Sequence, residues 1–153
     1  MNRRKVPEDP LEWPVYFPPT DPVKKFFIGL RWLGPDLSFF EELRHLQAAR
    51  TIVHMSSWPT NEERDIALRM GKHFQRSIGW KTEYFLPNDR FCVVAYGPWF
   101  QSMDGDDLFE DAVVGIRKEL RADLPDDFWR QTYEWNLQEV VCEILKKKIE
   151  TTH

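Results

Sequence analysis

Four carboxylates are the residues of this chain whose types and spacing come closest to a chemical site. Asp104, Asp106 and Asp107 surround a glycine, and Glu110 follows one helical turn later. Such a cluster could ligate a cation, begin a helix, or attract a positively charged partner. A twelve-residue calcium loop counted from Asp104 would end at Gly115, which lacks the carboxylate needed there. We therefore expect no metal, and predict that these four residues form an acidic helix start that docks a protein partner with a basic surface.

The residues that follow predict the helix that carries this cluster. Asp107 and Glu110 have the spacing of an N-cap and the third helical residue in a capping box, so Asp107 is the predicted N-cap. The predicted helix ends near Asp123, just before a proline. Apolar residues recur at every fourth position between these limits, which predicts one buried face: Leu108, Ala112, Ile116 and Leu120.

Similar signals predict helices on both sides of this segment. Capping boxes begin at Ser38, Thr60 and Asn136, and an apolar stripe of helical period follows each of them. Gly79 is placed to end the helix that Thr60 begins. An earlier short helix is expected over residues 23–33. The predicted fold class is therefore mainly α.

One part of the fold remains open from the sequence. Residues 90–96 are apolar and β-branched in part, so they could form a strand, and residues 51–55 are the only candidate partner for it. We therefore expect a helical bundle that includes, at most, one short hairpin-like pair of strands. The alternative fold class is α+β.

The order of these elements suggests three segments in one compact unit. Residues 1–20 hold five prolines and form an extended arm, residues 21–55 form a helix pair, and residues 56–150 form the main bundle. Trp13 and Phe17 lie in the arm. They either fix the arm onto the bundle, which is the interpretation we favour, or belong to a recognition segment.

Composition excludes several functional classes. The chain has 153 residues and a formal net charge of −4, and no dense basic stripe predicts a nucleic-acid surface. No apolar run is long enough to span a membrane, and the only cysteines are Cys92 and Cys142, which favours the cytoplasm. The histidines lack metal-ligand spacing, and no nucleophile or phosphate-loop motif occurs. We therefore expect a protein that is not an enzyme.

The segment around the acidic cluster resembles the acyl carrier protein family. Asp104-Gly105-Asp106-Asp107-Leu108 stands where that family has the D-S-L motif that opens its second helix, and Leu124-Pro125-Asp126-Asp127 resembles a later I-P-D-E stretch. The D-G-D-D form is closest to uncharacterised bacterial proteins of the DUF1493 type. The resemblance implies a helical bundle and, in a true carrier, a serine that bears a phosphopantetheine arm.

This chain departs from the family at that serine. The corresponding position holds Asp106 or Asp107, and a carboxylate cannot take the place of the hydroxyl. Ser102 lies nearby but lacks the leucine that should follow it. We therefore predict a non-catalytic, acyl-carrier-like interaction domain of the bacterial cytoplasm, without a cofactor. The alternatives are an immunity- or inhibitor-type binding module and a true carrier modified at Ser102.

Overall fold

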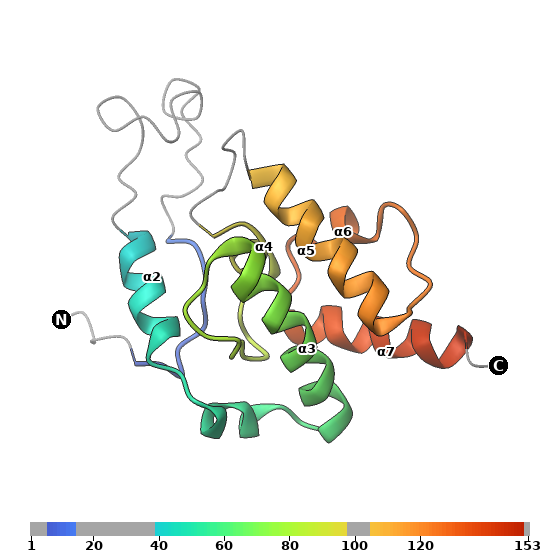
Figure 1. The fold of residues 1–153 in the computed structure, drawn as a ribbon. Coiled ribbons are helices and arrows are strands. Elements are labelled where there is room, and N and C mark those ends of the chain that lie inside the picture. Colours follow the sequence, from blue (N-terminus) through green and yellow to red (C-terminus); the bar gives the residue numbers. More distant parts are fainter. Residues whose placement is uncertain (1–5, 15–38, 98–104, 152–153) are drawn as a thin grey trace.

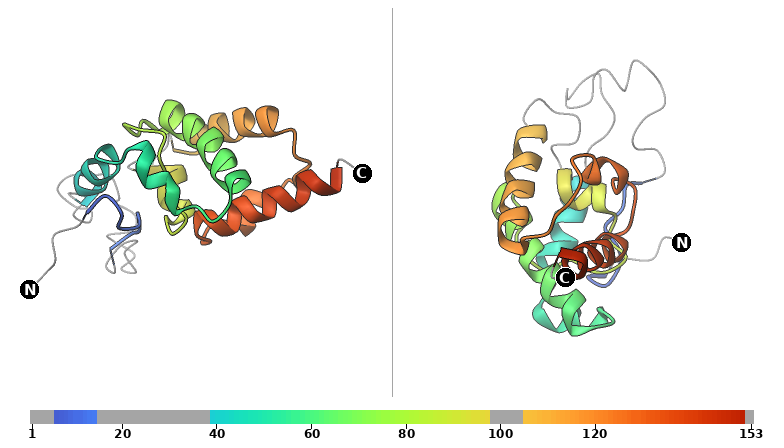
Figure 2. Two further views of the ribbon diagram at one scale, coloured as in Figure 1. Left: turned by 90° about the horizontal axis from the view of Figure 1, so that it is seen from below. Right: turned by 90° about the vertical axis from the view of Figure 1, so that its right-hand side faces the viewer.

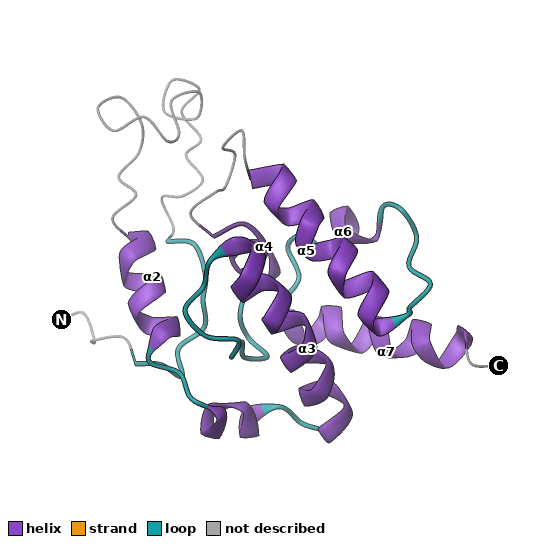
Figure 3. Ribbon diagram, viewed as in Figure 1, coloured by secondary structure: helices purple, strands orange, loops and turns teal. Residues whose placement is uncertain are grey.

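The computed structural model describes residues 6–14, 39–97 and 105–151, and in these ranges the chain is helical (Figures 1 and 3). The described residues contain no strand, and their only bridge of β type joins Arg90 and Asn136. The predicted mainly α fold class is confirmed. The helices are α2 (Phe39–Ala48), the 3₁₀ helix η1 (Ile52–Ser57), α3 (Asn61–Ile78), α4 (Phe91–Tyr96), α5 (Gly105–Leu120), α6 (Phe128–Gln131) and α7 (Leu137–Thr151).

The expected pair of strands is wrong. Residues 91–96 form the short helix α4, and residues 52–57 form η1. Five of the six residues of α4 are buried, so its apolar run reflects burial on all sides, and such a run does not separate a strand from a buried helix. The backbone N–H of Phe91 donates to the carbonyl oxygen of Trp135 at 2.9 Å, which fixes the start of α4 against the chain before α7.

Two predicted capping boxes are confirmed. The Thr60 hydroxyl accepts a hydrogen bond from the backbone N–H of Glu63 at 3.1 Å, and Gly79 ends α3 with a left-handed φ of 97°. At the start of α7, Asn136 Oδ1 accepts from the backbone N–H of Glu139 at 2.9 Å, and the Glu139 carboxylate accepts from the backbone N–H of Asn136 at 3.2 Å. These bonds satisfy donors that a helix start leaves without partners.

The predicted N-cap role of Asp107 is wrong. Helix α5 begins at Gly105, so Asp107 is already the third residue of the helix. An N-cap has a non-helical backbone, and the spacing to Glu110 could not decide which of several neighbouring carboxylates would occupy that position. The charge of Asp107 still lies in the first turn, where the helix dipole favours it. Residues 23–33 and Ser38, with their predicted helix and cap, lie outside the described residues.

Helix α3 occupies the centre of the packing. It contacts α4, α5 and α7, and the two views of Figure 2 show α5 and α7 beside it. The predicted apolar stripes of α3, α5 and α7 supply about a third of the core residues, although Leu108 near the start of α5 is only partly buried. The same core cluster extends from Leu11 to Ile144. Its stripe residues are Ile66, Met70, Phe74, Ile78, Ala112, Ile116, Leu120, Val140, Val141 and Ile144.

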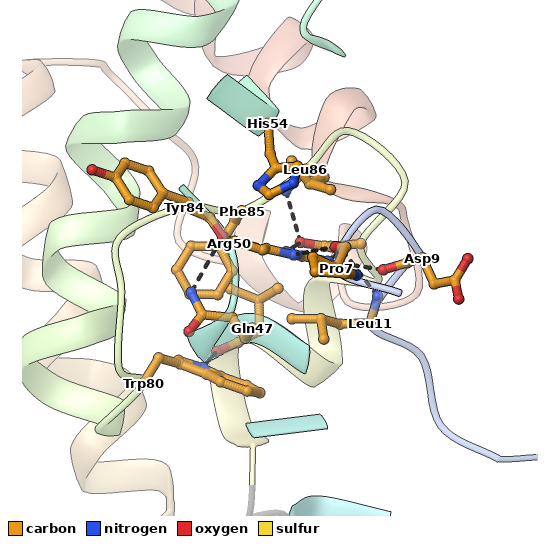
Figure 4. A network of polar contacts seen from close by, with 12 residues as sticks. Pro7, Asp9, Leu11, Gln47, Arg50, His54, Trp80, Tyr84, Phe85 and Leu86 are labelled. Atoms are coloured by element: carbon orange, nitrogen blue, oxygen red, sulfur yellow. Dashed lines mark hydrogen bonds and ion pairs between the residues drawn. The ribbon is translucent and has the colours of Figure 1, made fainter. Parts of the chain in front are cut away.

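A buried ion pair ties the N-terminal segment to this core (Figure 4). The guanidinium of Arg50 donates to both carboxylate oxygens of Asp89, at 2.6 and 2.9 Å, and neither side chain is exposed. The same guanidinium donates to the backbone carbonyl oxygens of Pro7, Asp9 and Tyr84, at 2.9, 2.9 and 3.3 Å. Such bidentate pairing of an arginine with a carboxylate is among the stronger and more specific polar contacts in proteins.

The Asp89 carboxylate is equally well satisfied. It accepts hydrogen bonds from the backbone N–H groups of Leu11 at 2.9 Å and Leu86 at 2.7 Å. The carbonyl oxygen of Leu11 in turn accepts from the backbone N–H of Arg90 at 2.8 Å. Leu11 is itself fully buried. The segment 6–14 is therefore built into the fold through backbone and side-chain contacts together.

Trp13 packs on α2. Its ring meets Phe39 and Phe40 edge-on, with ring centroids 6.0 and 5.4 Å apart. This contact agrees with the interpretation that aromatic residues fix the arm onto the domain. Trp13 also meets residues 56–150, because its side chain is hydrogen-bonded with Cys92. Phe17 lies outside the described residues.

Candidate functional site

The structure places only part of the predicted docking cluster. Ser102 and Asp104 lie outside the described residues, and Asp106 is described only as a backbone position in the first turn of α5. Asp107 and Glu110 are exposed on α5. Glu110 is therefore the predicted site residue whose surroundings the structure defines most fully.

Glu110 lines a groove of about 390 Å³ between α5 and α6, here called the α5–α6 groove. Its apolar lining comes from Phe109, Val113 and Trp129, and Val114 beside them is 44% exposed. The groove is also lined by both acidic and basic side chains. The remaining lining residues are Glu110, Arg117, Asp126 and Arg130.

Two residues that line this groove, Arg117 and Trp129, each hold a buried donor. These donors, Nε of Arg117 and Nε1 of Trp129, have no hydrogen-bond partner in the described part of the chain. The indole is held in place by stacking on Phe91, with centroids 5.6 Å apart, and by the edge of Phe128 at 4.9 Å. A buried donor without an acceptor costs about 1–3 kcal/mol. An acceptor brought by a bound molecule would offset part of this cost.

The two orphan donors could not have been found from the sequence. Arg117 appears there as one charged residue of a helix, and Trp129 as one aromatic residue of a short helical segment. Arg117 uses Nη2 to donate to the carbonyl oxygens of Leu124 and Pro125, at 3.3 and 3.2 Å, and only this folded arrangement leaves Nε without an acceptor.

A second groove, of about 520 Å³, lies between α3 and α5 and is here called the α3–α5 groove. His73 of α3 spans it, because Nε2 lies 2.7 Å from Oε2 of Glu119 and Nδ1 lies 3.0 Å from Nη2 of Arg76. A guanidinium can only donate, so Nδ1 accepts from Arg76 and the proton on Nε2 is donated to Glu119. Lys72 and Lys118 complete the polar lining.

Gly115 allows this arrangement. A Cβ atom added at Gly115 would lie 2.5 Å from Nδ1 of His73, which is too close for the ring to keep its place. The imidazole therefore packs where α5 has no side chain, and it is only 13% exposed. The sequence shows His73 only as a histidine without ligand spacing, because Glu119 and Gly115 come from a helix far away in the chain.

The cysteines are not reactive groups in this structure. Burial and the neighbouring Glu63 carboxylate raise the pKa of the Cys142 thiol to about 11, and burial raises the pKa of Cys92. The Cys142 thiol donates to Glu63 Oε1 at 2.8 Å, and this hydrogen bond is the main reason why the pKa of Glu63 is lowered. Both thiols stay protonated near neutral pH, and the thiolate is the nucleophilic form.

The residues that the structure describes contain no group of three or more histidine, cysteine or acidic side chains that could hold a metal ion. None of their helices is long and apolar enough to cross a membrane. Comparison of the chain with family models, curated proteins and solved structures finds no match. The acyl-carrier resemblance therefore remains a prediction, and the case for function depends on the geometry of the grooves.

Proposed function

We propose that this protein is a non-catalytic protein-interaction domain whose partner binds in the α5–α6 groove. The observation that carries the proposal is the combination, in one groove, of an apolar lining with the two orphan donors Arg117 Nε and Trp129 Nε1. The acidic side chains of Asp107 and Glu110 lie on the same helix, and Asp126 lies on the groove itself.

The chemistry of the groove defines the kind of partner. An apolar side chain of the partner would cover Phe109, Val113 and the exposed part of Val114. A lysine or arginine would meet the carboxylates of Glu110 and Asp126, because opposite charges across an interface set its orientation and association rate. The occupant that fits is therefore an amphipathic segment of another protein whose basic side chains meet Glu110 and Asp126 and lie away from Arg117 and Arg130.

Backbone carbonyl groups of the same segment would supply the missing acceptors. A hydrogen bond to Arg117 is charge-assisted and therefore stronger than one between neutral groups. Both donors are buried from water, so a local opening of the groove must accompany binding. This requirement makes the partner's acceptor a source of specificity, since a partner without one would leave both donors unpaired.

The proposal keeps the acyl-carrier-like character of the chain as an expectation. The resemblance leads one to expect a long helix, a long irregular connection, a second helix, a short helix and a final helix, and the described chain has α3, α5, α6 and α7 in this order, with the additional helix α4 in the connection. A carrier modified at Ser102 is the alternative that makes a distinct prediction. Coexpression with a phosphopantetheinyl transferase should leave the mass of the protein unchanged, and a gain of one phosphopantetheine arm would overturn the non-covalent role.

Charge reversal tests the docking surface. We expect Glu110→Lys to abolish co-purification of the partner from cells of the source organism, while Glu62→Lys, at an exposed position in the first turn of α3, leaves it intact. The co-purified protein should also elute as salt is raised, because salt screens such contacts. Equal recovery with both variants, or equal loss with both, would contradict docking in this groove.

A further inference from the structure

The α3–α5 groove carries a different set of charges from the proposed docking surface. Lys72, Arg76 and Lys118 are exposed along it, and none of them forms an ion pair within the described residues. Figures 1 and 2 show the two helices that carry them lying side by side. The chain as a whole has a net charge of −4, so the three cations make this groove a positively charged patch on an acidic protein.

The acidic residue of this groove does not neutralise these cations directly. The carboxylate of Glu119 accepts from Nε2 of His73, and Nδ1 of His73 accepts from Arg76. Glu119 thus holds the imidazole, and the imidazole holds the guanidinium. Since one of its five N–H groups is used in this way, the guanidinium of Arg76 is oriented and keeps donors for a ligand.

We propose that the α3–α5 groove binds a small phosphorylated molecule. Lys72, Arg76 and Lys118 would contact the phosphate oxygens, and His73 would act as a positioning residue for Arg76. A guanidinium matches two phosphate oxygens at once, and the two ammonium groups add charge without fixed direction. The volume of about 520 Å³ falls within the range of small-molecule sites, about 300–1,000 Å³.

Glu119 narrows the class of ligand further. One of its oxygens accepts from His73, and the other has no hydrogen bond in the described structure. This oxygen would repel a bare phosphate but would accept a hydroxyl group of the ligand. A phosphate ester of a sugar or of another polyol therefore fits the groove better than an inorganic anion of the same charge.

The test is a calorimetric titration of the purified chain with inorganic pyrophosphate and with ribose 5-phosphate, at constant ionic strength set with chloride. We expect saturable binding of both, with ribose 5-phosphate bound more tightly than inorganic pyrophosphate because its hydroxyl groups can donate to Glu119. The double substitution Arg76→Gln and Lys118→Gln should weaken it about tenfold or more, because charge-assisted hydrogen bonds are lost. The matched substitution Lys81→Gln, at an exposed lysine outside the groove, should change the affinity less than about twofold.

The role of His73 has its own control. Glutamine can still accept from Arg76 and donate to Glu119, so His73→Gln should keep most of the affinity, whereas His73→Leu should lose it. If His73 had only a structural role, the affinity of the His73→Leu variant would equal or exceed that of the His73→Gln variant. If the double variant fails to fold, as judged by circular dichroism, the exposed single substitution Lys72→Gln carries the same test.

Two results would overturn this proposal. One is that neither pyrophosphate nor ribose 5-phosphate binds saturably, and vesicles that contain phosphatidic acid do not bind either. The other is that such vesicles bind while neither soluble probe does, which would make the groove a membrane-facing surface. The proposal does not depend on the docking role of the α5–α6 groove, because Glu110→Lys should leave the titration unchanged.

Discussion

The buried ion pair and the α5–α6 groove place charged and polar side chains in two contrasting situations. Arg50 and Asp89 are fully buried, and backbone groups of two separate chain segments, residues 7–11 and 84–86, satisfy the hydrogen bonds that they do not make to each other. Arg117 and Trp129 each keep a buried donor without an acceptor. The first site is complete within the described residues, whereas the described residues supply no acceptor for the two donors of the second.

The difference separates polar groups that stabilise the fold from polar groups available for binding. A buried charge is tolerated when it is paired and hydrogen-bonded, and removal of one partner then leaves an uncompensated charge. Exposed charges contribute little to folding but can direct association. Substitutions in the two regions should therefore differ in what they change, and the following predictions use that difference.

The largest expected effect is at the buried pair. Asp89→Ala should lower the free energy of unfolding by about 3–5 kcal/mol, because Arg50 would remain buried without its carboxylate. Urea unfolding measures this change. Arg69→Ala is the control, since its ion pair with Asp65 is exposed and should be worth at most about 1 kcal/mol. Similar losses for the two variants would mean that the buried pair is not a centre of stability.

The next effect concerns the contact between α3 and α5. Gly115→Ala should destabilise the fold by about 1–3 kcal/mol through overpacking, because the added Cβ would meet His73 Nδ1 at 2.5 Å. The higher helix propensity of alanine offsets about 1 kcal/mol of this. In chemical unfolding, the double variant Gly115→Ala with His73→Ala should be less unstable than the sum of the two single variants. Simple additivity would show that the two residues do not compete for space.

A smaller effect depends on pH. The Cys142 thiol ionises near 9.0 in the unfolded chain and at about 11 in the folded one, so the unfolded state releases its proton first. Its contribution to stability is complete below pH 9 and is lost as the pH rises from 9 to 11. Thermal unfolding across this range should show a steeper fall for the natural protein than for Cys142→Ser, whose hydroxyl can still donate to Glu63. Equal slopes would contradict the raised pKa.

Low pH affects the hydrogen bond between Cys142 and Glu63 through the carboxylate of Glu63. The pKa of Glu63 is lowered from an ordinary value of 4.5, chiefly by the hydrogen bond from Cys142. Its contribution to stability is present above pH 4.5 and is lost as the pH falls through the lowered pKa. Unfolding measured between pH 5 and 3 should show a weaker acid dependence for Glu63→Gln. An unchanged dependence would leave Glu63 without this role.

The smallest effect on folding is expected in the α5–α6 groove. Val114→Ser removes apolar surface from a side chain that is 44% exposed, so the free energy of unfolding should change by about 0.5 kcal/mol or less. Partner binding should weaken at the same time. A loss of stability comparable with that of Asp89→Ala would place Val114 with the structural residues and remove the contrast between the two regions.

The sequence predicted the parts of the fold that depend on local chemistry. The capping boxes at Thr60 and Asn136 and the glycine at the end of α3 each depend on residues within a few positions of one another. The predicted start of α5 is wrong, because several adjacent carboxylates could serve as the cap and the spacing between Asp107 and Glu110 does not select one of them. It also could not separate a buried helix from a strand over residues 90–96.

Both grooves depend on contacts that no local pattern records. His73 meets Glu119 and Gly115 across 46 and 42 positions of the chain, and only the packing of α3 on α5 brings them together. Glu110 was predicted as a docking residue from its charge alone. The apolar residues and orphan donors lie beside it only because α6 packs against α5.

Site-specific photo-crosslinking tests the central claim most directly. A photoreactive phenylalanine analogue at Val114 would lie on the α5–α6 groove, and the same analogue at Val53, which is 73% exposed on η1, provides the control. In cells of the source organism, position 114 should yield one dominant adduct, joined to a basic and amphipathic segment of the partner, and position 53 should yield none. Equal adducts from both positions, or none from position 114, would contradict the assignment of this groove as the docking surface.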